Sequence, residues 1–212
     1  MSLRCKVVII GAGGHAKVII DILKSNPAFE LVGCTDQVVN RQVSGIPVLG
    51  DDSILPELYA QGIRHVFVAI GGNSLRHNLA RRAVETGFEL INAISPFAYV
   101  ADSVKLGCGI AIMPGAILNA EADIGNNAII NTGASVDHEC NIGETCHVGP
   151  GCNISGHVTI GEGTFLGTGT KVIDGMTIGS WSILGSGAVV VKDIPSRCLA
   201  VGVPAKVIKR LT

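Results

Sequence analysis

The sequence predicts two domains of different fold class. Residues 1–94 are expected to form an α/β Rossmann-like domain, and residues 95–212 an all-β parallel β-helix, a solenoid of hexapeptide repeats. In the second part an aliphatic residue returns at every sixth position, and in the first a glycine-rich turn joins an apolar segment to a helical pattern. The 28 glycines and the 4% aromatic content also favour stacked aliphatic strands over a mixed core.

The N-terminal domain opens with an apolar strand expected from Lys6 to Ile10 and a helix expected to end near Lys24. The turn between them has the sequence GAGGH at residues 11–15, so it contains Gly11, Gly13, Gly14 and His15. A strand-to-helix turn of this kind directs backbone N–H groups and a helix N-terminus toward a phosphate. Many such turns only cap a helix, so nucleotide binding and capping both remain open at this stage.

Two further strands of this domain end in polar or glycine residues. A strand over 31–35 is followed by Asp36, the place of an acid that binds a ribose hydroxyl. A strand over 65–70 is followed by Gly71, Gly72 and Asn73, and then by a helix predicted over 74–85. The segment 88–94 leads to a Ser-Pro pair at 95–96, the expected boundary.

The solenoid prediction rests on an unbroken period of six. Seventeen positions in steps of six, from Ile94 to Val190, are all Ile, Leu or Val. This period fits neither a helix nor an alternating strand, but it fits a triangular coil of three short strands with one hexad for each strand. Residues i and i+18 should then stack about 4.8 Å apart, with the aliphatic side chain pointing inward and the glycine that often follows it turning the corner. The span would hold roughly five coils.

The composition argues against several partners. The net charge is −1 without a basic block, so neither nucleic acid nor an anionic membrane is expected as a partner. No apolar run approaches the length of a membrane-spanning helix. The seven cysteines form no CxxC pair, which favours a reduced, cytoplasmic setting. Three of them, at 140, 146 and 152, occupy a hexad place that small residues fill elsewhere, so they are expected to pack rather than react.

The solenoid carries one arrangement suited to acyl transfer. His138 lies three hexads before Gly156, so an imidazole and a backbone amide should stack on neighbouring coils as general base and oxyanion donor. Asp137 and Glu139 are both candidates for orienting the imidazole. As alternatives, the histidines could be surface residues, His157 could simply pair with Glu139, or three histidines could hold zinc between subunits.

A second column suggests a place for a thin ligand. Gly149, Gly167 and Gly185 follow one another at intervals of three hexads, and Thr168 and Ser186 form the adjacent column. A row of glycines would let pantetheine lie against the edge of the coils with backbone amides available. The alternative is that these glycines only turn corners.

Five segments together resemble a known family. They are VIIGAGGHAK at 8–17, GIPVLG at 45–50, INTGASVDHECNIG at 130–143, HVGPG at 147–151 and VGVPAKVI at 201–208. In this order they resemble the hexapeptide-repeat nucleotide-sugar acetyltransferases, which include the bacillosamine-pathway and perosamine N-acetyltransferases and the sialic acid O-acetyltransferases. The resemblance covers nearly the whole chain and implies a left-handed β-helix, acetyl-CoA as cosubstrate, no metal, and a homotrimer with active sites between subunits.

The resemblance also implies roles for particular residues. His138 would be the general base, Glu139 would orient it, and Asn131 would lie near the reacting centre. His147 and the Gly156 amide would contact acetyl-CoA, and the coils with Gly167, Thr168, Gly185 and Ser186 would hold its pantetheine. The turn with Gly11, Gly13, Gly14 and His15, together with Asp36 and Gly71, Gly72 and Asn73, would meet the nucleotide sugar.

The expected function is therefore N-acetylation of an amino group on a nucleotide-linked sugar, by direct transfer in a ternary complex. O-acetylation of a sugar hydroxyl, as in the sialic acid enzymes, is the nearest alternative. A non-catalytic solenoid scaffold is the alternative from another class. Relatives often have consecutive acids after the second strand, where this chain has Asp36-Gln37, so the nucleotide base and the sugar stay open.

Overall fold

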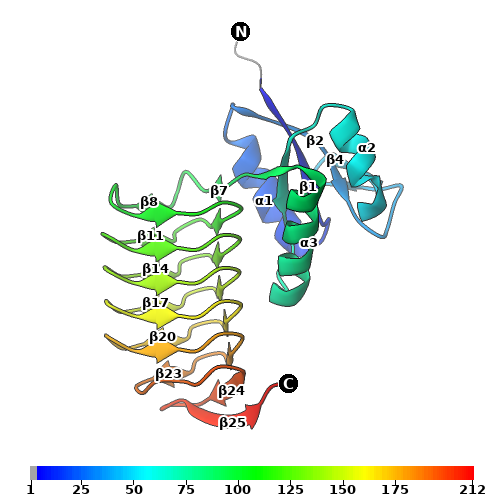
Figure 1. Cartoon of the computed structure of the whole chain (residues 1–212). Coiled ribbons are helices and arrows are strands. Elements are labelled where there is room, and N and C mark those ends of the chain that lie inside the picture. The colour runs from blue at the N-terminus through cyan, green and yellow to red at the C-terminus, as the bar shows by residue number, and fades with distance from the viewer. Residues whose placement is uncertain (1–3) are drawn as a thin grey trace. The chain divides into compact units, whose positions relative to one another are not determined.

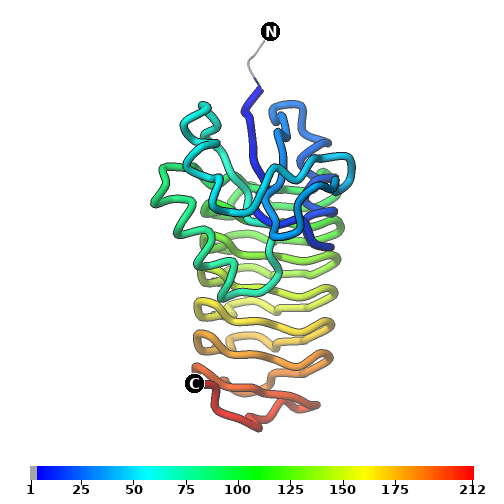
Figure 2. Tube along the Cα trace, turned by 90° about the vertical axis from the view of Figure 1, so that its right-hand side faces the viewer, coloured from blue at the N-terminus to red at the C-terminus, as the bar shows by residue number. Residues whose placement is uncertain are grey.

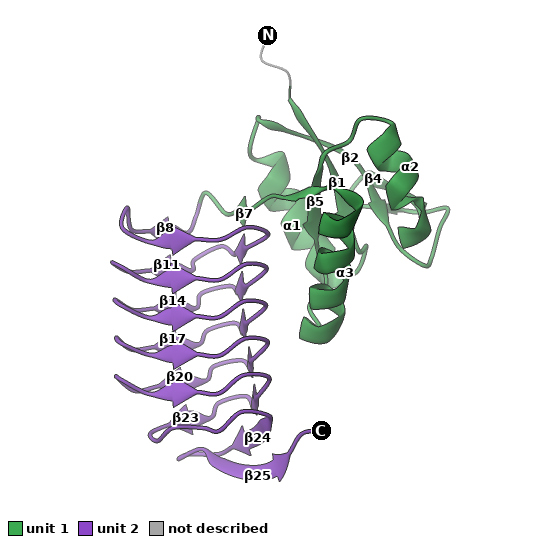
Figure 3. Cartoon of the chain, in the orientation of Figure 1, with its two compact units in different colours: residues 1–96 green, residues 97–212 purple. Residues whose placement is uncertain are grey.

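The computed structural model describes residues 4–212, and the chain divides into two compact units, residues 1–96 and 97–212 (Figure 3). The predicted fold class is confirmed: an α/β Rossmann-like unit is followed by a repeat region of parallel strands (Figure 1). No helix in the described part of the chain has the length and apolar character needed to cross a membrane.

The first unit is built on a six-stranded sheet in the order β3-β4-β2-β1-β5-β6, parallel except for the β3–β4 pair. Its strands are β1 (Cys5–Ile10), β2 (Phe29–Thr35), β3 (Gln42–Val43), β4 (Ile46–Gly50), β5 (His65–Val68) and β6 (Glu89–Leu90). Its helices are α1 (Gly14–Lys24), η1 (Asp52–Ile54), α2 (Leu55–Ala60) and α3 (Asn73–Thr86). A short strand, β7 (Ala93–Ile94), lies at its end. The sequence did not predict the elements between 37 and 64.

The second unit is a stack of coils, each of which takes three hexads of sequence (Figure 2). One face contains β10 (Ala111–Ile112), β13 (Ile129–Ile130), β16 (His147–Val148), β19 (Phe165–Leu166), β22 (Ile183–Leu184), β24 (Cys198–Val201) and β25 (Lys206–Arg210). A second contains β8 (Tyr99–Val100), β11 (Ile117–Leu118), β14 (Ser135–Val136), β17 (Asn153–Ile154), β20 (Lys171–Val172) and β23 (Val189–Val190). The third contains β9 (Lys105–Leu106), β12 (Asp123–Ile124), β15 (Asn141–Ile142), β18 (Thr159–Ile160) and β21 (Thr177–Ile178).

The register follows the predicted period. Ser135 pairs with Asn153 and Asn153 with Lys171, each three hexads further along the chain. From Leu118 to Val190 the sixth-place aliphatic residues are buried and form one continuous core. Ile94, the first of these positions, is 41% exposed although its strand β7 lies beside β10 in the same sheet. It precedes the first complete coil, so it has no earlier coil to pack against.

The corners are made differently from the prediction. The glycines that follow the aliphatic residue do not take a left-handed conformation. They are needed by coil stacking instead, because a Cβ on Gly143 would lie 2.7 Å from the Glu162 nitrogen and one on Gly167 2.6 Å from the Ser186 nitrogen. The corner residue with positive φ comes two positions later and is often glycine, but at 139 and 157 it is Glu and His, each with φ of 56°. Their side chains therefore leave the coil at equivalent corners.

Candidate active site

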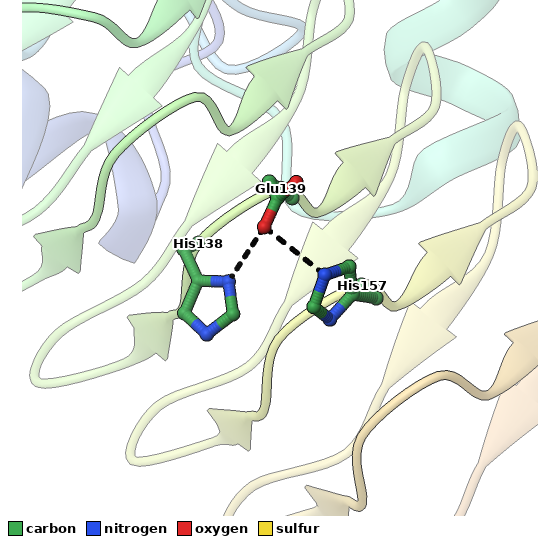
Figure 4. Close-up of side chains that lie close together, drawn as sticks. All are labelled: His138, Glu139 and His157. Atoms are coloured by element: carbon green, nitrogen blue, oxygen red, sulfur yellow. Dashed lines mark hydrogen bonds and ion pairs between the residues drawn. The ribbon is translucent and has the colours of Figure 1, made fainter.

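His138 and Glu139 occupy the corner between β14 and β15 (Figure 4). The Nδ1 atom of His138 lies 3.1 Å from Oε2 of Glu139, and both side chains are about half exposed. A carboxylate at Nδ1 favours the tautomer with the proton on that nitrogen, which leaves the lone pair on Nε2. The arrangement presents a base at Nε2 of His138.

Asp137, the other candidate carboxylate, contacts the backbone and Asn119 rather than the imidazole. Its Oδ1 accepts a hydrogen bond from the His138 backbone N–H at 2.8 Å and another from Asn119 at 3.0 Å. These two bonds hold the pKa of the Asp137 carboxyl below its usual value. The structure thus separates the two candidates, because Glu139 contacts the imidazole and Asp137 contacts the backbone.

The next coils add His157 and Asp174 to this corner. Nε2 of His157 lies 3.0 Å from the same Glu139 oxygen that contacts His138, and its Nδ1 lies 3.1 Å from Oδ1 of Asp174. The hydrogen bond that His157 donates to Asp174, and then the charge of Glu139, raise the pKa of His157. The expected pairing of His157 with Glu139 is present, together with an Asp174 contact that sequence reasoning missed. The spacing could have indicated this contact, since Asp174 lies three hexads after Gly156.

Gly156 lies beneath the His138 ring, as its spacing predicted. A Cβ at this position would lie 2.5 Å from Cε1 and 2.8 Å from Nε2 of His138, so only glycine leaves room for the imidazole. Within residues 4–212 the Gly156 N–H has no hydrogen-bond partner. An imidazole and an uncommitted backbone donor therefore stand together.

Asn131 and His147 form a separate pair. The Asn131 amide nitrogen and His147 Nε2 are 2.9 Å apart, and the mostly buried His147 ring meets the Phe165 ring edge-on at 5.1 Å between centroids. Asn131 follows β13 at the corner that leads into β14, whereas His138 follows β14 at the next corner. Within one chain these two groups belong to different corners of the coil.

The predicted pantetheine residues share the corner of Asn131. Thr168 and Ser186 are exposed on successive coils of the column that continues from Thr132. Gly167 is buried against the backbone of the next coil, and the equivalent space at Gly185 is bounded by Val201. The stacking requirement accounts for glycine at 167 without any ligand, so contact of this column with acetyl-CoA remains a prediction.

The buried cysteines behave as core residues. The side chains at 140, 146 and 152 lie in the solenoid core, and burial raises the pKa values of the Cys140 and Cys152 thiols. A raised thiol pKa disfavours the thiolate that nucleophilic catalysis needs.

In the first unit, the predicted nucleotide-contacting residues lie at one edge of the sheet, at the carboxyl ends of β1, β2 and β5. Gly11 has φ of +102°, and a Cβ there would lie 2.7 Å from Ile70. Gly13, Gly14, Gly71 and Gly72 have open space where a Cβ would be. Sequence reasoning missed the buried Arg76. Its side chain donates to the carbonyls of Ile70 and Gly71 and so holds the loop between β5 and α3. Asn73 is the first residue of α3.

Asp36 links the loops that follow β1 and β2 at this edge. Its Oδ2 accepts from the Ala12 N–H at 3.1 Å and pairs with Arg41 at 3.2 Å, while its Oδ1 accepts from the Val38 N–H at 2.9 Å. The Val38 bond, the Ala12 bond and Arg41 lower the pKa of the Asp36 carboxyl. Asp36 thus stabilises the glycine turn, and a role in binding a ribose would come in addition.

His15 is held in the neutral form. Burial, with a smaller contribution from the charge of Arg76, lowers the pKa of His15 to about 4, and its Nε2 is buried without a hydrogen-bond partner within residues 4–212. A neutral imidazole beside a glycine turn can act as donor or acceptor toward a ligand.

This lowered pKa predicts acid sensitivity of the first unit. Between pH 6.5 and about 4 the unfolded chain binds a proton at His15 that the folded chain does not, so stability falls as pH falls. We expect a loss of about 3 kcal/mol across this range in the wild type that is absent in His15→Gln. Urea unfolding followed by circular dichroism at 222 nm measures it, since the described helices all lie in this unit. His65→Gln is the control, and equal pH dependence in all three proteins would contradict the prediction.

The corner with His138 also has the donor types of a metal site. One ligand atom each from His138, Glu139 and His157 can be chosen so that all three lie within 4.8 Å of one another. The observed contacts instead pair each imidazole with a carboxylate in ordinary hydrogen-bond geometry. The expectation of no metal remains a prediction.

Two family models match the chain. The PglD N-terminal domain matches residues 6–83, and the bacterial transferase hexapeptide (six repeats) matches residues 139–174. The fold and the repeat thus define a hexapeptide-repeat acyltransferase with a PglD-type N-terminal domain.

Solved structures make the assignment more specific. PerB of Caulobacter crescentus, in complex with CoA and GDP-perosamine, is 50% identical over 96% of this chain and 97% of that chain, with a TM-score of 0.92. The acetyltransferase domain of PglB of Neisseria gonorrhoeae, in complex with acetyl coenzyme A, is 34% identical over 97% and 100% of the two chains, with a TM-score of 0.92. The chain belongs to the family of sugar acetyltransferases that includes these two proteins, as the resemblance predicted.

An uncharacterised protein of Acanthamoeba polyphaga mimivirus also matches. It is 31% identical over 109 residues, which is 51% of this chain and 21% of that much longer protein.

Proposed function

We propose that this protein transfers the acetyl group of acetyl-CoA to the amino group of a nucleotide-linked amino sugar. The observation that carries the proposal is the His138 imidazole, held through Nδ1 by Glu139 and seated over the free N–H of Gly156. The presence of CoA with GDP-perosamine in the 50% identical relative supports the substrate classes.

The geometry supports a direct transfer. Nε2 of His138 takes the proton of the attacking amine as the new N–C bond forms. The Gly156 N–H donates to the oxygen of the tetrahedral intermediate, and the C–S bond then breaks to release CoA. Glu139 stabilises the imidazolium that His138 becomes. We assign His147, Asn131, Gly167, Thr168, Gly185 and Ser186 to the donor side.

A trimer would complete this site. The donor-side residues and His138 stand at different corners of one chain's coil, so a site that contains both needs corners from two copies. In a homotrimer, the threefold rotation brings one corner of each copy next to a different corner of its neighbour, which makes three equivalent sites. Sedimentation should give three times the 21.9 kDa chain mass, and a fully active monomer would contradict the shared site.

The test is acetyl transfer from acetyl-CoA to UDP-, GDP- and CMP-linked amino sugars, with NMR spectroscopy of the product to distinguish an amide from an ester. An acetamide on one of them is the expected result. An ester product would establish the O-acetyltransferase alternative, and neither product, with no acetyl-CoA binding, would leave the scaffold alternative.

We further propose that the first unit selects the acceptor through the turn with Gly11, Gly13, Gly14 and His15, through Asp36, and through Gly71, Gly72 and Asn73. Asp36→Ala is expected to weaken nucleotide-sugar binding by roughly ten- to a hundredfold, because a ribose hydroxyl loses its acceptor and the glycine turn loses its anchor. Acetyl-CoA affinity should not change. Calorimetry with both ligands on one preparation measures this.

The control for this variant is Asp51→Ala, which removes a comparable capping bond to Ser53 in the same unit. Loosening of the domain alone would weaken acceptor binding equally in both variants. Unchanged acceptor binding in Asp36→Ala would place the nucleotide elsewhere.

A further inference from the structure

His157 stands between two carboxylates. Its Nε2 is 3.0 Å from Glu139 and its Nδ1 is 3.1 Å from Asp174, both normal N–H···O distances. A neutral imidazole has one N–H, so it could satisfy one carboxylate but would turn a lone pair toward the other. The distances therefore fit a doubly protonated ring, with Nδ1 donating to Asp174 and Nε2 ion-paired with Glu139.

This ring is tied to the base through a shared atom. Oε2 of Glu139 accepts from His138 and is ion-paired with His157, and the two imidazole rings meet edge-on with centroids 5.0 Å apart (Figure 4). The Glu139 side chain is 51% exposed, so water competes for it and several rotamers are open to it. A second, fixed donor would restrict that freedom.

Coil stacking fixes the backbone that carries this second partner of Glu139. His157 occupies the same corner place as Glu139, one coil further on, and its backbone N–H donates to the His138 carbonyl at 3.0 Å. Asp174 follows one coil after Gly156, where a Cβ on Gly156 would lie 3.1 Å from its carboxylate. The four side chains thus form the chain His138–Glu139–His157–Asp174 across three coils.

We propose that His157 and Asp174 are positioning residues for acetyl transfer: Asp174 holds His157, and His157 holds the Glu139 carboxylate against His138. The proposal rests on the function proposed above, in which His138 is the base. The raised pKa of His157, caused by Asp174 and then Glu139, agrees with it. Within residues 4–212, Glu139, Asp174 and His138 are the titratable groups in contact with the His157 side chain.

Charge gives the proposal a specific signature. A protonated His157 near the base opposes protonation of that base, so losing its charge should move the acidic limb of the kcat/KM profile to higher pH. A shift of about half a pH unit, from one charge about 5 Å away in water, lowers kcat/KM about threefold on that limb. A residue needed only for folding would not produce this shift.

The kinetic experiment uses the full-length enzyme with His157→Gln, Asp174→Asn and the double variant. Each single variant should lower kcat about five- to twentyfold and leave the KM for acetyl-CoA within twofold. His157→Gln should also move the acidic limb upward. The double variant should be no worse than His157→Gln, because Asp174 acts through His157. Asp123→Asn, an exposed carboxylate on β12, is the control with normal kinetics.

A second readout does not depend on activity. The chain has six histidines, so NMR of ¹³C-ε1-labelled histidine can follow each ring, with His157→Gln assigning the resonance of interest. In the wild type, His157 should titrate above the ordinary value, and in Asp174→Asn its pKa should fall. An ordinary His157 titration that Asp174→Asn leaves unmoved would overturn the proposal.

The outcomes separate the two proposals. Normal kcat and pH profiles in His157→Gln and Asp174→Asn, with an inactive His138→Ala, would overturn the positioning roles alone. Absence of acetyl transfer by the wild type to every amino-sugar nucleotide would overturn the proposed function instead.

Discussion

His138→Ala is expected to lower turnover by roughly 10²–10⁴ while acetyl-CoA still binds. The variant removes the Nε2 lone pair that would take the proton of the amine, whereas the donor-side residues stand at another corner of the coil. Glu139 keeps its contact with His157, so the corner should stay folded. Steady-state kinetics and calorimetry with acetyl-CoA measure the two effects.

His65→Ala removes a histidine in the first unit and is the control for this experiment. Its turnover should match the wild type. If His138→Ala keeps more than about a tenth of wild-type turnover, another group must be the base. Equal loss of acetyl-CoA binding would mean that His138 holds the donor rather than the proton.

Gly156→Ala is expected to lower turnover by about 10²-fold without destabilising the solenoid. The added methyl group would lie 2.5 Å from His138 Cε1, and the imidazole, as the end of a side chain, would move away. A displacement of about 1 Å at a catalytic group costs on the order of 10²-fold. The Gly156 N–H survives in this variant, so the loss would report the displaced base.

Gly115→Ala is the matched control, with the opposite expected signature. Gly115 has φ of +73° and only ordinary contacts for a Cβ, so alanine there strains the backbone without touching the site. It should cost about 1–2 kcal/mol of stability and leave turnover unchanged. Thermal unfolding and kinetics on both variants decide the matter, and normal turnover in Gly156→Ala would show that catalysis does not need the His138 ring over Gly156.

The solenoid could be predicted almost completely, because its structure is a direct consequence of the period. Once residues i and i+18 stack, the neighbours of His138 are known without coordinates, and Gly156 was found this way. The elements between 37 and 64 could not be predicted so, since short strands and helices there have no period and depend on packing against the sheet.

The sequence by itself determined the two fold classes, the repeat, the His138–Gly156 stack and the family. The tertiary structure alone decided which carboxylate meets the imidazole, because Asp137 and Glu139 flank His138 and only the left-handed backbone at Glu139 turns that side chain toward the ring. It alone also showed that glycine follows the aliphatic residue for close coil approach, and that Asp174 contacts His157. Distances between side chains on neighbouring coils depend on corner dihedral angles and rotamers, which a residue spacing does not contain.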